Sequence, residues 1–172
     1  MIIINKRNLF FLISVWLLST LLSAQNVTIS TPHTQLLLSV PNGGTPEQLY
    51  YGSRTSDADI RSICETARRR NAYPVYGMGY PCETALSVRH ADGNLTLQMA
   101  VIGVKETRLT KENATLTVIE LKDKVYPFFV NICYKAWQDA DVIETWTEIR
   151  HEEKKPVQLQ QFASAYLPVR RL

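Results

Sequence analysis

The densest group of side chains that could contact a ligand lies in residues 73–82, where three tyrosines, two prolines and two glycines fall within ten positions. Sugars present C–H faces that stack on aromatic rings, and tyrosine hydroxyls donate and accept hydrogen bonds. We therefore take Tyr76 and Tyr80 as weak candidates for substrate contact with a carbohydrate. The simpler interpretation is an ordered connection packed under a sheet, or a contact between subunits.

Two aspartates, Asp139 and Asp141, are the carboxylate pair that most resembles a catalytic one. Hydrolysis of a glycosidic bond needs two carboxyl groups that flank the bond. These two lie two positions apart in a turn between strong strand patterns, where aspartates are solvated or close the turn through their own hydrogen bonds. We expect neither to be catalytic, and the sequence offers no other catalytic residue.

Metal and cofactor sites are not expected either. His33, His90 and His151 are far apart and show no ligand spacing. The sequence Gly77-Met78-Gly79 lacks the third glycine of a dinucleotide loop and opens no helix pattern. There is no Gly-x-Ser-x-Gly motif of the kind that presents a nucleophilic serine.

Three cysteines limit the covalent chemistry of the chain. An odd number in an exported protein allows at most one internal bridge. A Cys64–Cys82 disulfide stays open as an alternative to free thiols. Cys133 lies in an alternating apolar pattern and is expected to be a small core residue.

Short strand patterns separated by turn residues must position these side chains. Alternation and β-branched residues predict strands at 35–40, 49–51, 85–90, 95–101, 114–122, 128–137, 142–150 and 157–167. In 128–137 the even positions are apolar and are expected to face the core. The turn at 138–141 predicts a hairpin between 128–137 and 142–150, and Asp92-Gly93 predicts one between 85–90 and 95–101.

One segment has a helical pattern instead. Ser56 is placed to cap a helix whose first turn carries Asp57 and Asp59. Apolar side chains follow at helical spacing, at Ile60, Ile63, Cys64 and Ala67. The basic run 68–70 is expected to be the solvated C-terminal end of this helix, where the dipole favours cations.

These elements predict an all-β fold: an antiparallel β-sandwich with one short helix over residues 25–172.

Lys6 and Arg7 are the only charged residues among the first 24, so the formal net charge of +3 falls to +1 without them. Such a balance does not indicate a nucleic-acid partner.

Residues 1–24 have the pattern of a signal peptide. A basic start precedes the apolar run 9–22, and small residues lead to an expected cleavage after Ala24. The alternative is an uncleaved anchor, but the run is shorter than the roughly 20 apolar residues that a span needs. We expect an exported, periplasmic or extracellular protein without a stable membrane span.

Three blocks, in order along the chain, resemble the N-terminal β-domain of glycoside hydrolase family 36, whose members are mostly α-galactosidases. They are Gln48-Leu49-Tyr50-Tyr51-Gly52, the run from Tyr73-Pro74-Val75-Tyr76-Gly77 through 83–88 to Ala91-Asp92-Gly93, and the stretch 134–165. In that family the β-sandwich precedes a barrel that carries an aspartate nucleophile and an aspartate acid/base. Its retaining enzymes release terminal α-galactose from oligosaccharides such as raffinose and melibiose.

The resemblance therefore implies an accessory domain of an exported α-galactosidase, which meets α-galactosides through the full-length enzyme. It also allows a homo-oligomer, with the 73–82 loop near a neighbour's active site. The barrel's nucleophile motif is absent, and Trp137-Gln138-Asp139 does not replace it. We expect this chain alone to be inactive and its sandwich to be incomplete. The alternative is a free-standing carbohydrate-binding or structural β-sandwich module.

Overall fold

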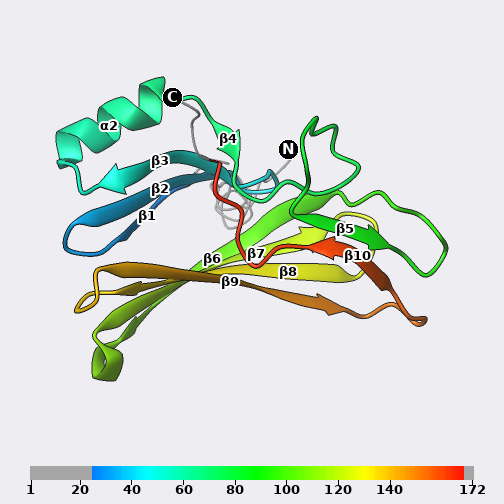
Figure 1. Ribbon diagram of the computed structural model, residues 1–172. Helices are drawn as coiled ribbons and strands as arrows, with labels where there is room; N and C mark the ends of the chain where they lie inside the picture. The colour runs from blue at the N-terminus through cyan, green and yellow to red at the C-terminus, as the bar shows by residue number, and fades with distance from the viewer. Residues whose placement is uncertain (1–24, 169–172) are drawn as a thin grey trace, which may run out of the picture.

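The computed structural model describes residues 25–168, whose strands stack in two layers (Figure 1). One layer is a four-stranded antiparallel sheet in which the strands lie in chain order. Its members are β6 (Met99–Leu109), β7 (Ala114–Asp123), β8 (Phe128–Trp137) and β9 (Val142–His151). A short 3-10 turn, η1 (Thr110–Glu112), connects β6 to β7.

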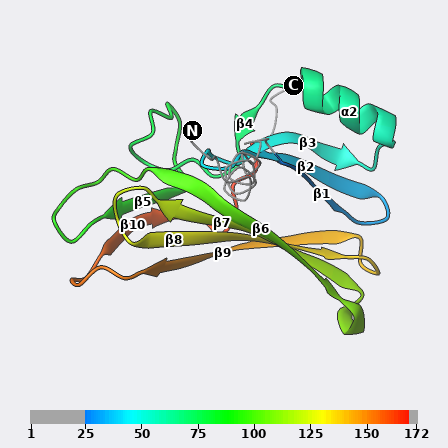
Figure 2. The ribbon, with the colours of Figure 1, turned by 180° about the vertical axis from the view of Figure 1, so that it is seen from behind.

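The second layer consists of two smaller antiparallel sheets that cover opposite ends of the first (Figures 1 and 2). One sheet contains β1 (Gln25–Ser30), β2 (Thr34–Val40), β3 (Glu47–Ser53) and the short β4 (Arg70–Asn71). The other pairs β5 (Leu86–Arg89) with β10 (Gln158–Phe162). The predicted all-β sandwich with one helix is confirmed.

The core lies between the layers and follows from the alternation of β8. All five even positions of this strand are buried, namely Phe128, Val130, Ile132, Tyr134 and Ala136. From the opposite layer, Ile29, Leu36 and Leu38 belong to the same cluster, together with Leu86 and Val88 of β5. Burying each large aliphatic side chain contributes roughly 1.5–3 kcal/mol. The sequence pattern therefore predicted the main buried face correctly.

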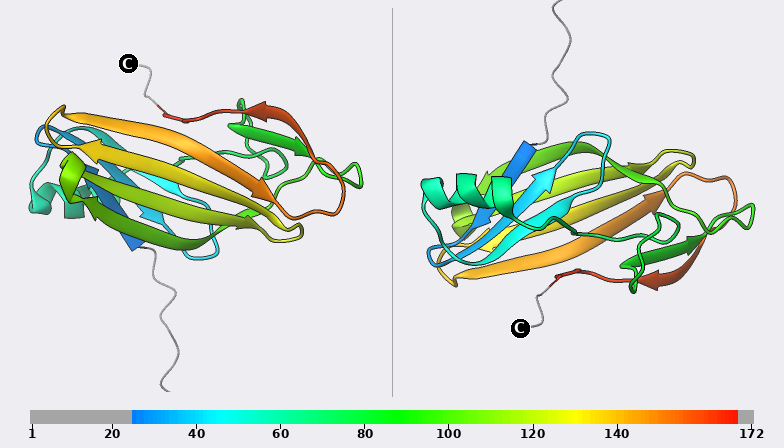
Figure 3. Two further views of the ribbon diagram at one scale, coloured as in Figure 1. Left: turned by 90° about the horizontal axis from the view of Figure 1, so that it is seen from below. Right: turned by 90° about the horizontal axis from the view of Figure 1, so that it is seen from above.

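The predicted helix is α2 (Asp57–Thr66), and Ser56 caps it as expected. The Ser56 side chain accepts a hydrogen bond from the Asp59 backbone N–H at 3.3 Å, which satisfies one of the free amides of the first turn. The helix lies across the outer side of the sheet formed by β1, β2 and β3 (Figure 3, right). Its apolar residues are only half-buried, so α2 covers this sheet loosely.

The prediction for the basic run 68–70 is wrong, because the helix ends at Thr66 before this run begins. Arg69 instead donates to the Ser39 hydroxyl at 2.8 Å and pairs with Glu47 at 3.1 Å. Arg70 belongs to β4 and donates to the Pro168 carbonyl at 3.1 Å. The Arg69 side chain therefore connects the chain after the helix to β2 and β3, whereas the Arg70 side chain connects β4 to the C-terminal end of the described chain.

The predicted hairpin at Asp92-Gly93 is also wrong, although the turn itself forms. The Gly93 N–H donates to the His90 carbonyl at 2.9 Å, but β5 pairs with β10 and not with β6. Residues 94–98 are not a strand, and β6 begins at Met99 rather than Leu95. The chain here crosses from one layer to the other, so a local turn signal does not bring its flanking strands together.

The last strand is shorter than predicted: β10 spans Gln158–Phe162, not 157–167. In the chain after β10, Ala163 and Tyr166 pack against the core. Within residues 25–168, no helix is both long and apolar enough to cross a bilayer. The proposed signal peptide, including Ala24, lies outside the described residues.

Candidate functional site

The loop 73–82 begins inside the core and ends at the surface. Tyr73 is buried, and its hydroxyl donates to the Ala163 carbonyl at 3.2 Å. Burial raises the pKa of the Tyr73 phenol above its usual value, although a hydrogen bond with Thr147 partly offsets this. Tyr73 therefore anchors the loop and is not available to a ligand.

Two glycines give the loop its sharp course. Gly77 and Gly79 have φ values of +98° and +71°, in the region that side chains disfavour. A Cβ at Gly77 would also lie 2.6 Å from the Thr96 side chain. Backbone hydrogen bonds fix the segment on both sides, from Tyr76 N–H to the Leu86 carbonyl at 2.9 Å and from Leu97 N–H to the Tyr76 carbonyl at 3.0 Å.

The two candidate tyrosines have different surroundings. The Tyr76 side chain is about half exposed at 48%, and the nearby Met78 is exposed at 42%. Tyr80 is half-buried; its hydroxyl lies 3.1 Å from the Tyr166 hydroxyl, and the two rings meet edge to face at 6.4 Å. This hydrogen bond raises the pKa of Tyr166 to about 12. Tyr76 is thus the freer of the two.

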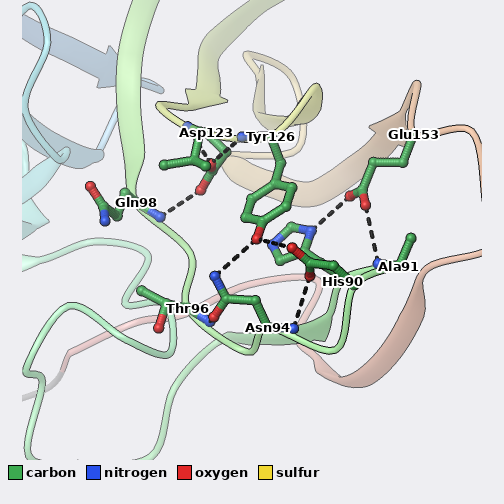
Figure 4. Close-up of polar contacts among 10 residues, drawn as sticks. His90, Ala91, Asn94, Thr96, Gln98, Asp123, Tyr126 and Glu153 are labelled. Atoms are coloured by element: carbon green, nitrogen blue, oxygen red, sulfur yellow. Dashed lines mark hydrogen bonds and ion pairs between the residues drawn. The ribbon is translucent and has the colours of Figure 1, made fainter.

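A buried polar cluster around His90 lies where β5 ends (Figure 4). The His90 ring is fully enclosed, and its Nδ1 lies 2.7 Å from Glu153 Oε1, whose side chain is 7% exposed. Tyr126 stacks on the imidazole at 3.7 Å with an interplanar angle of 9°, and Phe128 meets it edge-on at 5.8 Å. Within residues 25–168, the other ring nitrogen of His90 has no hydrogen-bond partner.

At the edge of this cluster, Tyr126 forms hydrogen bonds with the turn that follows β5 (Figure 4). Its hydroxyl donates to Asp92 at 2.7 Å and accepts from the Asn94 amide at 3.0 Å. The Asn94 backbone and Tyr126 lower the pKa of the Asp92 carboxyl, because both hydrogen bonds favour its ionised form. On the other side of Tyr126, the buried Asp123 accepts from the backbone of Gln98, Val125 and Tyr126. The cluster thus links three loops of the sandwich: the one after β5, the one between β7 and β8, and the one between β9 and β10.

The aspartates of the 138–141 turn act as structural acceptors. Asp141 accepts from the Thr31 hydroxyl and from the His33 backbone at 3.0 Å, and its other oxygen lies 3.2 Å from the His33 ring. The bonds to Thr31 and His33 lower the pKa of the Asp141 carboxyl. Asp139 accepts from the Asn113 amide at 2.6 Å. Both carboxylates thus bind neighbouring turns.

The cysteines are free thiols in the described chain, including Cys64 and Cys82. Cys133 is buried as expected, and burial raises the pKa of its thiol to about 11, so it is a poor nucleophile. Among residues 25–168, no group of three or more histidine, cysteine, aspartate or glutamate side chains is arranged to hold a metal ion.

Sequence reasoning treated His90 as an isolated residue and missed the cluster around it. Nothing in the sequence connects His90 with Glu153, which is 63 positions away. Asp123 could have been found, because an aspartate after a strand that accepts from the next backbone amides is a common turn device. The pairing of Tyr80 with Tyr166 had no local signal either.

Comparison with known proteins identifies the domain family of this sandwich. Residues 44–171 match the model of the glycosyl hydrolase family 36 N-terminal domain. Among curated proteins, none matches the chain.

Solved structures of α-galactosidases share the fold. The enzyme from Lactobacillus brevis superposes with a TM-score of 0.71 at 17% identity over 83% of this chain and 23% of its own. AgaA from Geobacillus stearothermophilus, solved with 1-deoxygalactonojirimycin, gives 0.72 at 15% identity over 81% and 24%. The galactosidase domain of the α-galactosidase-sucrose kinase AgaSK gives 0.68 at 21% over 80% and 24%. The chain thus spans about a quarter of the length of these structures.

Proposed function

Since the chain belongs to the glycosyl hydrolase family 36 N-terminal domain family, we propose that it is the accessory β-sandwich of an exported α-galactosidase and that the catalytic carboxylates lie outside residues 25–168. The observation that carries this proposal is the family match over 44–171. The carboxylates described here support it, since Asp139, Asp141 and Asp123 are engaged with neighbouring turns.

The substrate of the complete enzyme is proposed to be an α-galactoside. AgaA from Geobacillus stearothermophilus has been solved with raffinose and with stachyose, two oligosaccharides of this kind. The sandwich would then contribute by supporting the catalytic domain or by lying against a neighbouring subunit. The signal-like pattern of residues 1–24 supports export to the periplasm or the medium.

The 73–82 loop is the part of this domain proposed to approach a sugar, through Tyr76 rather than Tyr80. Tyr76 has an exposed ring, whereas the Tyr80 hydroxyl is hydrogen-bonded to Tyr166. In the complete enzyme, Tyr76→Ala is expected to raise KM for raffinose and leave the melting temperature unchanged. Tyr80→Ala is expected to lower the melting temperature instead. An unchanged KM for Tyr76→Ala removes the loop from substrate contact.

Reading the coding DNA beyond the codon for Leu172 tests the main proposal. We expect a barrel with an aspartate nucleophile, in the same frame or after a single frameshift. A clean stop with no barrel nearby would contradict it and favour a free-standing carbohydrate-binding or structural module.

A further inference from the structure

The outer face of the β6–β9 sheet is not covered by any other described element (Figure 3, left). Strand register aligns side chains on this face into rows that cross the sheet. One row consists of Gly103, Glu120, Asn131 and Glu148, one residue from each strand. The next row contains Lys122, Phe129 and Arg150.

A hollow of about 250 Å³ lies over these two rows. Its lining includes Ile102, Glu120, Phe129, Asn131, Glu148 and Arg150. Two features of β6 open it. The register shift between Val101 and Gly103 leaves Ile102 55% exposed at the rim. Gly103 leaves room for the Glu120 side chain, because a Cβ at this position would lie 3.0 Å from Glu120 Oε2.

The side chains around the hollow are held in place before any ligand arrives. The Phe129 ring lies between two cations, with the Arg150 guanidinium 4.2 Å and the Lys122 ammonium 5.7 Å from its centroid. Glu148 accepts from the Asn131 amide at 3.1 Å and from the Trp146 indole N–H at 3.2 Å. Such fixed groups lose little conformational entropy on binding.

We propose that this hollow is a binding site for a neutral oligosaccharide. Sugar hydroxyls both donate and accept hydrogen bonds, and the hollow offers carboxylate acceptors at Glu120 and Glu148 and an amide at Asn131. Ile102, exposed at the rim, supplies apolar surface for the C–H groups of the pyranose ring. The family match assigns no site to this face.

Other occupants fit the charges less well. Lys105 pairs with Glu120 at 2.6 Å and Arg150 also lines the hollow, so its charges nearly balance and give no net attraction for an acidic glycan or a nucleic acid. The centre of a protein interface is depleted of glutamate, whereas two glutamates line this site. A neutral, hydroxyl-rich ligand matches both the polar lining and the apolar rim.

Isothermal titration calorimetry tests the proposal on the full chain, in the form that its host produces. Two probes are neutral, raffinose and cellohexaose, and one is acidic, hexagalacturonate. We expect at least one neutral probe to bind and the acidic one not to bind. Glu148→Gln should weaken this binding about tenfold, because a charged hydrogen-bond acceptor becomes a weaker neutral one.

Glu144→Gln is the matched control. Glu144 lies on the same strand and face and also accepts from an indole N–H, that of Trp137 at 3.0 Å, but it is outside the hollow. Its affinity should equal that of the parent chain. Any one of three results overturns the proposal. Neither neutral probe binds, hexagalacturonate binds as tightly as the neutral probes, or both variants lose the same affinity.

This inference does not depend on the α-galactosidase assignment. If the downstream DNA encodes no barrel but the chain binds a neutral glycan through Glu148, the proposed function fails and this site stands. If a barrel is encoded but Glu148→Gln changes nothing, the site fails and the proposed function stands.

Discussion

At the scale of single residues, the His90 cluster is where a small change should matter most. Glu153 is the partner of a fully enclosed imidazole whose other nitrogen has no partner among the residues that the structure describes. Glu153→Ala removes the remaining acceptor from that ring, and an unpaired buried polar group costs about 1–3 kcal/mol. We expect the free energy of unfolding, measured with urea, to fall by about that amount.

Glu152→Ala is the control for this change, because Glu152 is the adjacent exposed carboxylate and pairs with Arg150 on the surface. Surface pairs contribute little, about 0–1 kcal/mol. Equal effects of the two substitutions would show that the buried contact has no special role.

A second residue-scale prediction concerns pH. Hydrogen bonds from Thr31 and His33 lower the pKa of Asp141 in the folded state. A lowered folded-state pKa gives stability that is present above the unfolded value of about 3.9 and is lost as pH falls through the folded value. Asp141→Asn should therefore lower the melting temperature at pH 7, and the difference from the parent chain should shrink below about pH 4.

The same series on Asp139→Asn provides the comparison, since Asp139 lies in the same turn and its partner is the Asn113 amide. A pH-independent difference for Asp141→Asn would contradict the linkage. The contacts of Asp141 with Thr31 and His33 join positions 110 and 108 apart along the chain, which is why the sequence showed only two turn aspartates.

At the scale of elements, α2 depends on its N-cap more than on burial. None of its residues is buried, whereas the Ser56 side chain binds the Asp59 amide. Ser56→Ala is expected to destabilise the helix by about 1 kcal/mol. Hydrogen exchange of the Asp59 and Ile60 amides should accelerate accordingly.

Ser62→Ala, inside the same helix and at an exposed position, should leave these exchange rates nearly unchanged. If Ser56→Ala has no larger effect than Ser62→Ala, the cap does not hold the helix in place.

Elements were predictable where a pattern was local and strong. The alternation of β8 and the turn at 138–141 predicted the β8–β9 hairpin and its buried face correctly. The Asp92-Gly93 turn had an equally strong local signal, but the partner of β5 is β10, about 70 positions later. Pairing between distant strands depends on which layer each strand joins, and a single sequence does not show this.

At the scale of the whole molecule, stability rests on the contact between the two layers. Leu38 from β2 is fully buried in that core. Leu38→Ala should lower the free energy of unfolding by about 2–5 kcal/mol, since it removes buried methyl groups and leaves a cavity. Val125→Ala, at a 65% exposed position, should change it by no more than about 0.5 kcal/mol.

The fold and the family were accessible from the sequence because strand patterns and three motif blocks extend over most of the chain. The candidate glycan site was not, because Gly103, Glu120, Asn131 and Glu148 come together only through the register of four strands. The buried cluster at His90 was missed for the same reason.

We propose that this sandwich serves an α-galactosidase whose catalytic carboxylates lie outside residues 25–168. The most direct test measures hydrolysis of p-nitrophenyl α-galactoside by this chain and by the product of the complete reading frame. We expect no hydrolysis by the chain and clear hydrolysis by the complete product. Hydrolysis by the chain alone, or none by a complete product that contains a barrel, would contradict the account.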